Sequence, residues 1–147
     1  MPPGTIIPEL VYADVRAAAA WLCRAFGFKE RLRIGRHRIQ LVFGEASVVA
    51  VDGGGGGAPA AGELAASHSL QGEHTHSVMV HVADVDRHYD QAVQSGARIL
   101  RSPETHPFGE RQYTALDLGG HQWTFSQTVA DIAPETWGGE MVGPCAA

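Results

Sequence analysis

The chain has 147 residues, of which 44% are hydrophobic, and this is enough apolar material for the core of one ordinary domain. Its formal net charge of -5 and its scattered Lys and Arg residues make nucleic acid a poor candidate partner. Because there is no run of about 18 apolar residues and no signal-peptide pattern, and because Cys23 and Cys145 lie far apart, we expect a cytoplasmic protein with no membrane partner and no disulfide framework.

The first part of the chain has the pattern of a strand, a helix and three further strands. Residues 6–12 are β-branched and aromatic enough for a strand, and Asp14 is placed to cap a helix. Gly27 suits the left-handed position that ends this helix. The apolar stripe of the helix comprises Val15, Ala18, Ala19, Leu22 and Phe26. Alternating patterns then predict strands over residues 31–36, 39–43 and 46–51.

Four arginines surround the first of these alternating segments. They are Arg31, Arg33, Arg36 and Arg38, and their spacing favours a solvated strand face over a phosphate site.

Residues 53–75 open with five consecutive glycines and continue through Ala, Pro, Ser and His. Ordering such a segment loses much conformational entropy and buries little apolar surface in return, so we interpret it as a linker, with a lid as an additional possibility. A phosphate-binding loop is disfavoured because no Lys-Ser or Lys-Thr pair follows the glycines.

The second part of the chain repeats the first pattern. Residues 78–82 form a predicted strand, Asp84 caps the next helix, and Gly96 ends it. The stripe of this helix comprises Val85, Tyr89, Ala92 and Val93. Strands are predicted over residues 97–101, 111–116 and 122–127. The tail, residues 128–147, contains Trp137, and we expect it to pack on the domain or on a second subunit.

The repetition is also literal, because Val-Tyr-Ala-Asp-Val at residues 11–15 returns as His-Val-Ala-Asp-Val at residues 81–85, seventy positions later. Each half therefore has the order β-α-β-β-β. We predict an α+β fold of two βαβββ modules, the first over residues 1–52 and the second over residues 76–127.

This duplicated unit, with Ala-Asp-Val before each helix and the ending Asp-Leu-Gly-Gly-His-Gln-Trp at residues 117–123, resembles the vicinal oxygen chelate superfamily of glyoxalases, bleomycin-resistance proteins and extradiol dioxygenases. Residues 5–28 and 108–125 are most similar to its PhnB-like group. The resemblance implies curved sheets that enclose a cleft, a homodimer, and in the enzymes of the superfamily a divalent metal held by one ligand in the first strand and one in the last strand of each module.

Carried over by residue, the metal positions of the superfamily fall on Ile7, Val48, Ser77 and Thr124, and none of these is a normal metal ligand. We therefore predict no metal cofactor. An alternative keeps a divalent metal with atypical ligands: His76 enters if the register slips by one residue, and His81, Glu45 and Glu110 are further substitutes. His68, His74 and His76 are explained more simply as loop residues, and His121 as a residue of the final turn.

A cleft with aromatic and polar walls remains, and it suits a planar or apolar small molecule. Its predicted lining comprises Ser77, Met79, His81, Phe108, Arg111, Tyr113, Gln122 and Thr124, with Trp21 as a further candidate. Trp123 is expected to face away, since it neighbours Thr124 in a strand. Tyr113 as a core residue and Arg111 as a surface residue stay open alternatives.

Three functions follow from these patterns. The first is a metal-independent small-molecule binding protein of the bleomycin-resistance type, which sequesters an aromatic or antibiotic-like ligand. The second is a metal-dependent glyoxalase-like lyase, isomerase or dioxygenase with atypical ligands. The third is metal-free acid-base catalysis by His81 with Tyr113 or Arg111, although a hydrogen-bonded wall residue is the simpler role for His81.

Overall fold

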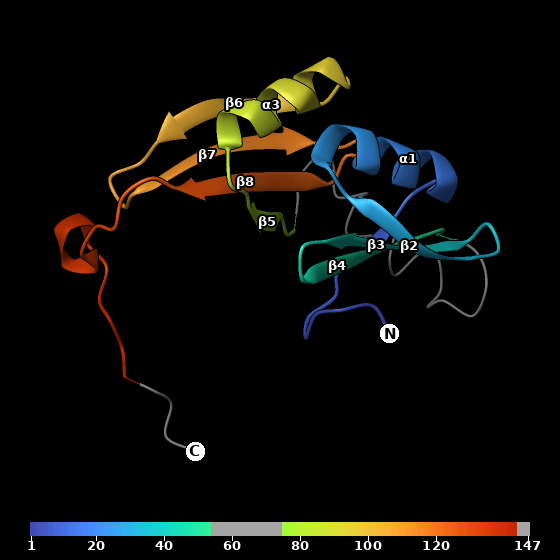
Figure 1. Ribbon diagram of the computed structural model, residues 1–147, viewed down its shortest axis with the longest axis horizontal. Helices are drawn as coiled ribbons and strands as arrows, with labels where there is room; N and C mark the ends of the chain where they lie inside the picture. Colours follow the sequence, from blue (N-terminus) through green and yellow to red (C-terminus); the bar gives the residue numbers. More distant parts are fainter. Residues whose placement is uncertain (54–74, 144–147) are drawn as a thin grey trace.

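The computed structural model describes residues 1–53 and 75–143, which form two modules of one helix and four strands each (Figure 1). The first module contains β1 (Glu9–Val11), α1 (Val15–Phe26), β2 (Lys29–Ile34), β3 (Arg38–Phe43) and β4 (Ala46–Val51). The second contains β5 (Val78–His81), α3 (Val85–Gln94), β6 (Arg98–Thr105), β7 (Glu110–Leu116) and β8 (Gln122–Thr128). The predicted α+β fold of two βαβββ modules is confirmed. The predicted linker lies almost entirely outside the described residues, as does Cys145.

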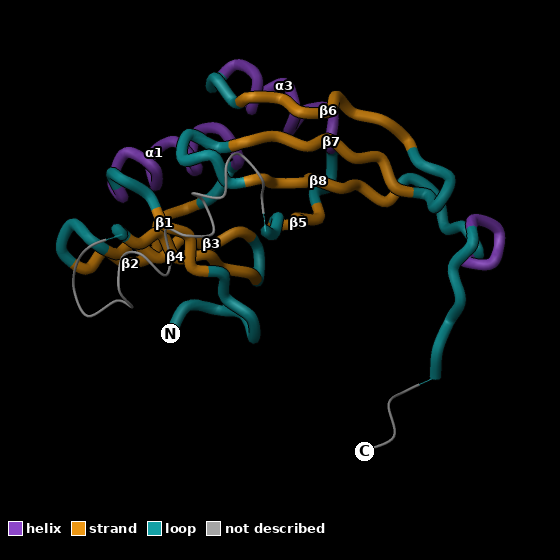
Figure 2. Tube along the Cα trace, turned by 180° about the vertical axis from the view of Figure 1, so that it is seen from behind, coloured by secondary structure: helices purple, strands orange, loops and turns teal. Residues whose placement is uncertain are grey.

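The two modules build their sheets in the same way, in the orders β1-β4-β3-β2 and β5-β8-β7-β6. In each sheet the first strand runs parallel to the last strand, and the other neighbours are antiparallel. Both helices lie on the outer side of the arch that the sheets form, next to each other, as Figure 1 and the reverse view in Figure 2 show. The sheets therefore keep one side free of helices.

The helix ends follow the predicted capping chemistry. The Asp14 side chain accepts a hydrogen bond from the Ala17 backbone N–H at 3.0 Å, and Asp84 accepts one from Arg87 at 3.1 Å. Gly27 ends α1 with φ of 82°, which is a conformation that glycine adopts without steric cost. Neither described helix is long and apolar enough to cross a membrane.

The core lies between the helices and the sheets, because alternate strand residues point toward the helices. Its largest side chains are aromatic: Phe26 from α1 contacts Trp123 and Phe125 from β8 at ring-centroid distances of 5.5 and 4.7 Å. We call the other side of each sheet its open face. Cross-strand partners share a face, so the open face of the second sheet carries Met79, His81, Gln112, Thr114, Gln122, Thr124 and Ser126.

The modules are joined by the buried carboxylate of Asp117, which follows β7. It accepts hydrogen bonds from the Tyr12 hydroxyl of the first module at 2.6 Å and from Trp123 Nε1 at 3.0 Å. The backbone N–H groups of Gly119 and His121 donate to its other oxygen at 2.9 and 3.0 Å. A side chain at Gly119 would clash, since a Cβ there would lie 2.6 Å from the Tyr12 ring. The Asp-Leu-Gly-Gly-His-Gln-Trp segment is thus an inter-module joint.

A second contact between the modules is made by His88 of α3. Its Nε2 lies 2.8 Å from the Phe26 carbonyl oxygen and its Nδ1 2.5 Å from the Tyr113 hydroxyl. A carbonyl only accepts, so Nε2 carries the proton and Nδ1 of the neutral ring accepts from Tyr113. Burial lowers the pKa of His88 below its ordinary value, against a smaller opposing effect of the Phe26 carbonyl.

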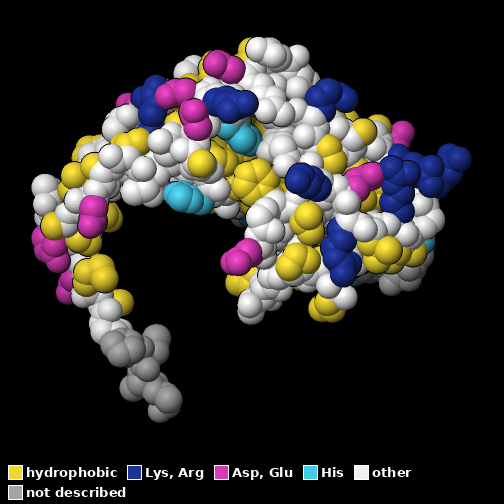
Figure 3. Space-filling view, in the orientation of Figure 1, with side chains coloured by type: hydrophobic (Ala, Val, Ile, Leu, Met, Phe, Trp, Pro, Cys, Tyr) yellow, Lys and Arg dark blue, Asp and Glu magenta, His cyan; other side chains and the backbone are white. Residues whose placement is uncertain are grey.

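The tail folds back on the far end of the second module before it leaves the domain. The 3-10 helix η1 (Pro134–Trp137) places Trp137 against Phe108 of the β6–β7 turn, with ring centroids 5.7 Å apart. Beyond it, Met141 and Val142 are 74% and 83% exposed. The tail borders a hollow beneath the second sheet, with the first module on the other side (Figure 3).

Replacing Tyr12 with Phe is expected to lower the free energy of unfolding by about 1–3 kcal/mol, because Asp117 loses a donor in a buried position. Urea denaturation measures the change. Tyr89→Phe is the matched control, since the Tyr89 hydroxyl has no hydrogen-bond partner within the described part of the chain. Equal destabilisation by the two variants would show that Tyr12 does not join the modules through its hydroxyl.

The lowered pKa of His88 also predicts a pH dependence of stability. In the unfolded chain this histidine protonates near its ordinary pKa of 6.5, whereas in the folded protein it stays neutral to lower pH. The contribution to the free energy of unfolding is therefore complete above about pH 6.5 and decreases as the pH falls below it. In denaturation series across this range, wild type should lose more stability on acidification than His88→Gln; parallel curves would contradict the assignment.

Candidate functional site

A groove with a volume of about 640 Å³ lies between the modules, bounded by the β3–β4 hairpin on one side and strand β5 on the other. The first module lines it with Ile6, Pro8, Phe28 and residues 43–48, and the second with residues 78–81 and Trp123. Apolar side chains form most of this lining. The groove is therefore suited to an apolar body, with orientation left to the few polar groups.

The polar side chains of the groove are Glu45, Ser47 and His81. The buried Ser47 hydroxyl donates to the Pro3 carbonyl at 2.5 Å and so attaches the N-terminal segment to the hairpin. His81 is exposed, and its Nε2 lies 3.3 Å from the Thr128 hydroxyl. Glu45 is exposed and forms no ion pair with the described residues. Two ionisable groups thus remain accessible to a ligand.

Four of the residues predicted from the sequence to line the site lie together. Met79 and His81 line the groove, and Met79 is 65% exposed. Gln122 and Thr124 lie on the open face of the same sheet, where the Thr124 hydroxyl is 3.1 Å from that of Thr114. The groove and the open face meet along strand β5, since His81 belongs to both.

Ser77 and Phe108 lie elsewhere. Ser77 is exposed and precedes β5 without lining the groove. Phe108 lies in the β6–β7 turn, where its ring stacks on His106 at 5.0 Å and contacts Trp137 of the tail. Phe108 therefore holds the tail in place.

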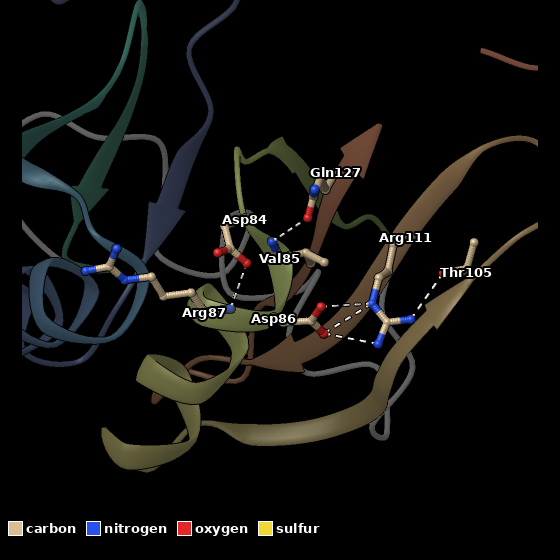
Figure 4. Close-up of polar contacts among 7 residues, drawn as sticks. All are labelled: Asp84, Val85, Asp86, Arg87, Thr105, Arg111 and Gln127. Atoms are coloured by element: carbon tan, nitrogen blue, oxygen red, sulfur yellow. Dashed lines mark hydrogen bonds and ion pairs between the residues drawn. The ribbon is translucent and has the colours of Figure 1, made fainter. Parts of the chain in front are cut away.

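Arg111 and Tyr113 correct the predicted lining, because the alternation of β7 turns both toward the helices. Arg111 forms an ion pair with Asp86 of α3 and bonds to the Thr105 hydroxyl at 3.1 Å (Figure 4). Tyr113 is 1% exposed, burial raises its pKa, and its hydroxyl donates to His88. These residues lie across the sheet from the open face, so the geometry offers neither of them as a proton-transfer partner of His81.

Trp21 and Trp123 are core residues. Trp21 Nε1 donates to the Ser95 carbonyl at 2.8 Å, which adds a third contact between the modules. Trp123 is fully buried on the helix side, as expected, although it also borders the groove.

The contribution of the first module was missing from the predicted site. Phe43, Ala46 and Val48 of the β3–β4 hairpin line the groove beside Glu45, and Ile6 and Pro8 come from the segment before β1. Their alternation indicated strands, but the strand pattern carries no information on which part of the other module a hairpin faces. Glu45 was predicted only as a substitute metal ligand.

The metal positions of the resembled superfamily do not suit a metal here. Strand pairing corrects one of them: Glu9 pairs with Val49 as Met79 pairs with Thr124, so Val49 rather than Val48 is the counterpart of Thr124. Val49, like Ile7, offers no lone pair to a metal. Among the described residues, no group of three or more His, Cys, Asp or Glu side chains could hold a metal ion. Within the described part of the chain, the His76 side chain forms one hydrogen bond, with the Thr75 hydroxyl at 3.1 Å.

Residues 7–125 match the sequence profile described as the Glyoxalase/Bleomycin resistance protein/Dioxygenase superfamily. Among solved structures, TioX from Micromonospora sp. ML1 is 34% identical with a TM-score of 0.68, and the match covers 85% of this chain and 98% of TioX. A glyoxalase/bleomycin resistance protein/dioxygenase family enzyme from Burkholderia phytofirmans PsJN is 19% identical with a TM-score of 0.67, covering 83% and 96%. No curated protein matches the chain.

Protein purified without chelator and without a histidine tag is expected to contain far less than one divalent metal ion per chain, because the donor set is unsuitable. Elemental analysis by mass spectrometry gives the content. His76→Ala and His81→Ala should leave it unchanged. Near-stoichiometric metal that disappears in either variant would overturn this prediction and support a metalloenzyme.

Proposed function

The chain belongs to the glyoxalase/bleomycin resistance protein/dioxygenase superfamily, and from this membership we propose that it is a metal-independent small-molecule binding protein of the bleomycin-resistance type. Its ligand is an aromatic or antibiotic-like compound held in the groove between the modules. The observation that carries the proposal is the groove itself, which has mostly apolar walls and only Glu45, Ser47 and His81 as polar members. A volume of about 640 Å³ lies within the roughly 300–1,000 Å³ of small-molecule sites.

Binding without chemistry accounts for the polar groups better than catalysis does. His81 has only the Thr128 hydroxyl as a hydrogen-bond partner within the described residues, so nothing there orients or activates it as a general base. The positions that would hold a metal in superfamily enzymes carry Ile7, Val49, Ser77 and Thr124. Apolar burial, with a few orienting hydrogen bonds, is what this site can supply.

We also propose that the protein is a homodimer of the PhnB-like group. Dimers are frequent in the superfamily. Trp137 is 42% exposed, and Met141 and Val142 project beyond it, so this chain alone leaves apolar surface of the tail in water. A second copy that covers the tail would remove that surface from solvent. Light scattering of the purified protein reports the mass, which is 15.7 kDa for one chain.

The role of the groove in ligand binding is tested by filling it with a larger side chain. Ala46 is exposed on the hairpin and lines the groove, so Ala46→Trp adds a large side chain inside it without disturbing the core. Titration with the neutral apolar dye Nile red, followed by fluorescence, should show at least about tenfold weaker binding than wild type, equivalent to about 1.4 kcal/mol.

The matched control is Ala20→Trp, which introduces the same side chain at an exposed position of α1 outside the groove. Its dissociation constant should equal that of wild type. The proposal fails if the folded protein binds neither the dye nor any member of a drug-like library in thermal-shift measurements, or if Ala46→Trp binds as tightly as the control.

A further inference from the structure

Among the side chains that line the groove, the charged one is the acidic residue Glu45. The lining includes the carboxylate of Glu45 and neither Lys nor Arg, so a ligand in the groove meets a negative group and the imidazole of His81. The ion pairs of the described residues use Glu30, Glu9 and Asp86, which leaves the charge of Glu45 without a basic partner there. This carboxylate is free to interact with a ligand.

The end of the open face that carries Glu110 is also acidic, whereas Arg98 and Arg101 lie toward the other end of this face, paired with Leu116 and Thr114. His81 lies across from Ser126, and Ser126 from Gln112, so three neighbouring strands supply one polar row. Gln112 Nε2 donates to the Ser126 hydroxyl at 3.0 Å, and this hydroxyl donates to Glu110 Oε1 at 2.8 Å. The half-buried Glu110 thus has one oxygen hydrogen-bonded and no ion pair with any described residue. Glu104, paired with Gln112, adds an exposed carboxylate at the sheet edge.

The first sheet carries an ion pair near the corresponding place. Arg38 pairs with Val51 as Gln112 pairs with Ser126, so Arg38 and Gln112 occupy equivalent places. Arg38 forms an ion pair at 2.8 Å with Glu9 of the neighbouring row, so this acid is compensated within the chain. In the second module Gln112 stands at the place of the arginine, and Glu110, two residues before it, forms no ion pair with a described residue.

We propose that the groove is selective for ligands that combine an apolar ring system with a protonated amine, and that Glu45 and Glu110 provide this selectivity. The inference rests on the proposed binding function and adds the chemical class of the ligand. A carboxylate attracts an ammonium group and repels an anionic one, and partial removal of water strengthens both effects. Strands are about 4.8 Å apart, so Glu110 on β7 lies roughly 10 Å across the sheet from β5. An amine on a tether of several carbons can therefore span from the groove to the open face.

The test compares two fluorescent probes that differ only in charge. Dansylcadaverine carries a dansyl ring system and a protonated amine on a five-carbon tether, and N-pentyl dansylamide is its neutral analogue. For wild type at low ionic strength, the amine probe should bind about fivefold more tightly than the neutral one, and the preference should shrink as salt is added.

In the double variant Glu45→Gln/Glu110→Gln, the amine probe should no longer bind more tightly than the neutral one. Asp90→Asn/Glu135→Gln is the matched control: both acids are exposed, lie outside the groove, and remove the same net charge. This control should keep the preference for the amine.

Equal binding of both probes by wild type, or an unchanged preference in the double variant, would overturn the inference while leaving the binding function intact. Loss of the preference in the control as well would overturn it too, because diffuse net charge would then explain the effect. If neither probe nor Nile red binds, the proposed function itself fails.

Discussion

The arrangement of this protein depends on one buried carboxylate. Asp117 has four hydrogen-bond donors, and they come from both modules and from its own turn. A buried charge is costly unless it is fully hydrogen-bonded, so the turn, the Trp123 ring and the Tyr12 hydroxyl must all be in place together. His121 extends the joint, because its Nε2 donates to the Val11 carbonyl at 2.8 Å and holds β1. The groove has a defined shape because the modules that form its walls are held in this way.

Periodicity and capping were sufficient to predict the fold. Asp14 and Asp84 cap helices through side-chain bonds that depend on only three residues of sequence, and the alternation of β7 and β8 is equally local. The repeat of residues 11–15 at residues 81–85 then indicated two equal modules. These signals are short in range, which is why the order of strands and helices followed from them.

The site was predictable only in part, because it depends on contacts between distant residues. The alternation of β7 showed that Arg111 and Tyr113 share a face of the sheet, but it did not show which face the helix covers. The contacts of these two residues with Asp86 and His88 of α3 show that they lie on the helix side. Met79 and His81 followed from the strand pattern combined with the superfamily resemblance. The hairpin residues around Glu45 could not be predicted as part of the site, since nothing in residues 43–48 indicates that they face β5. Burial also shows that Tyr113 is an aromatic residue of the core and does not belong to a binding wall.

The chemistry of the proposed site depends on a difference in charge pairing between the two modules. In the first module Arg38 forms an ion pair with Glu9, whereas Glu110 of the second module has a serine hydroxyl as its partner. A serine stabilises the charge without cancelling it. The end of the open face near Glu110 therefore keeps a negative charge, which would face the amine of the proposed ligand.

The two hairpins that follow β3 and β7 occupy the same topological place, yet they differ in length. Phe43 pairs with Ala46, which leaves a two-residue turn, whereas Leu116 pairs with Gln122, which leaves a five-residue turn. The longer turn contains Asp117, which joins the modules at one junction. The shorter turn leaves the corresponding junction open, and this opening is the groove. The difference of three residues between these turns thus distinguishes the two module junctions: one is closed by a hydrogen-bonded turn, and the other keeps the space in which we propose that a ligand binds.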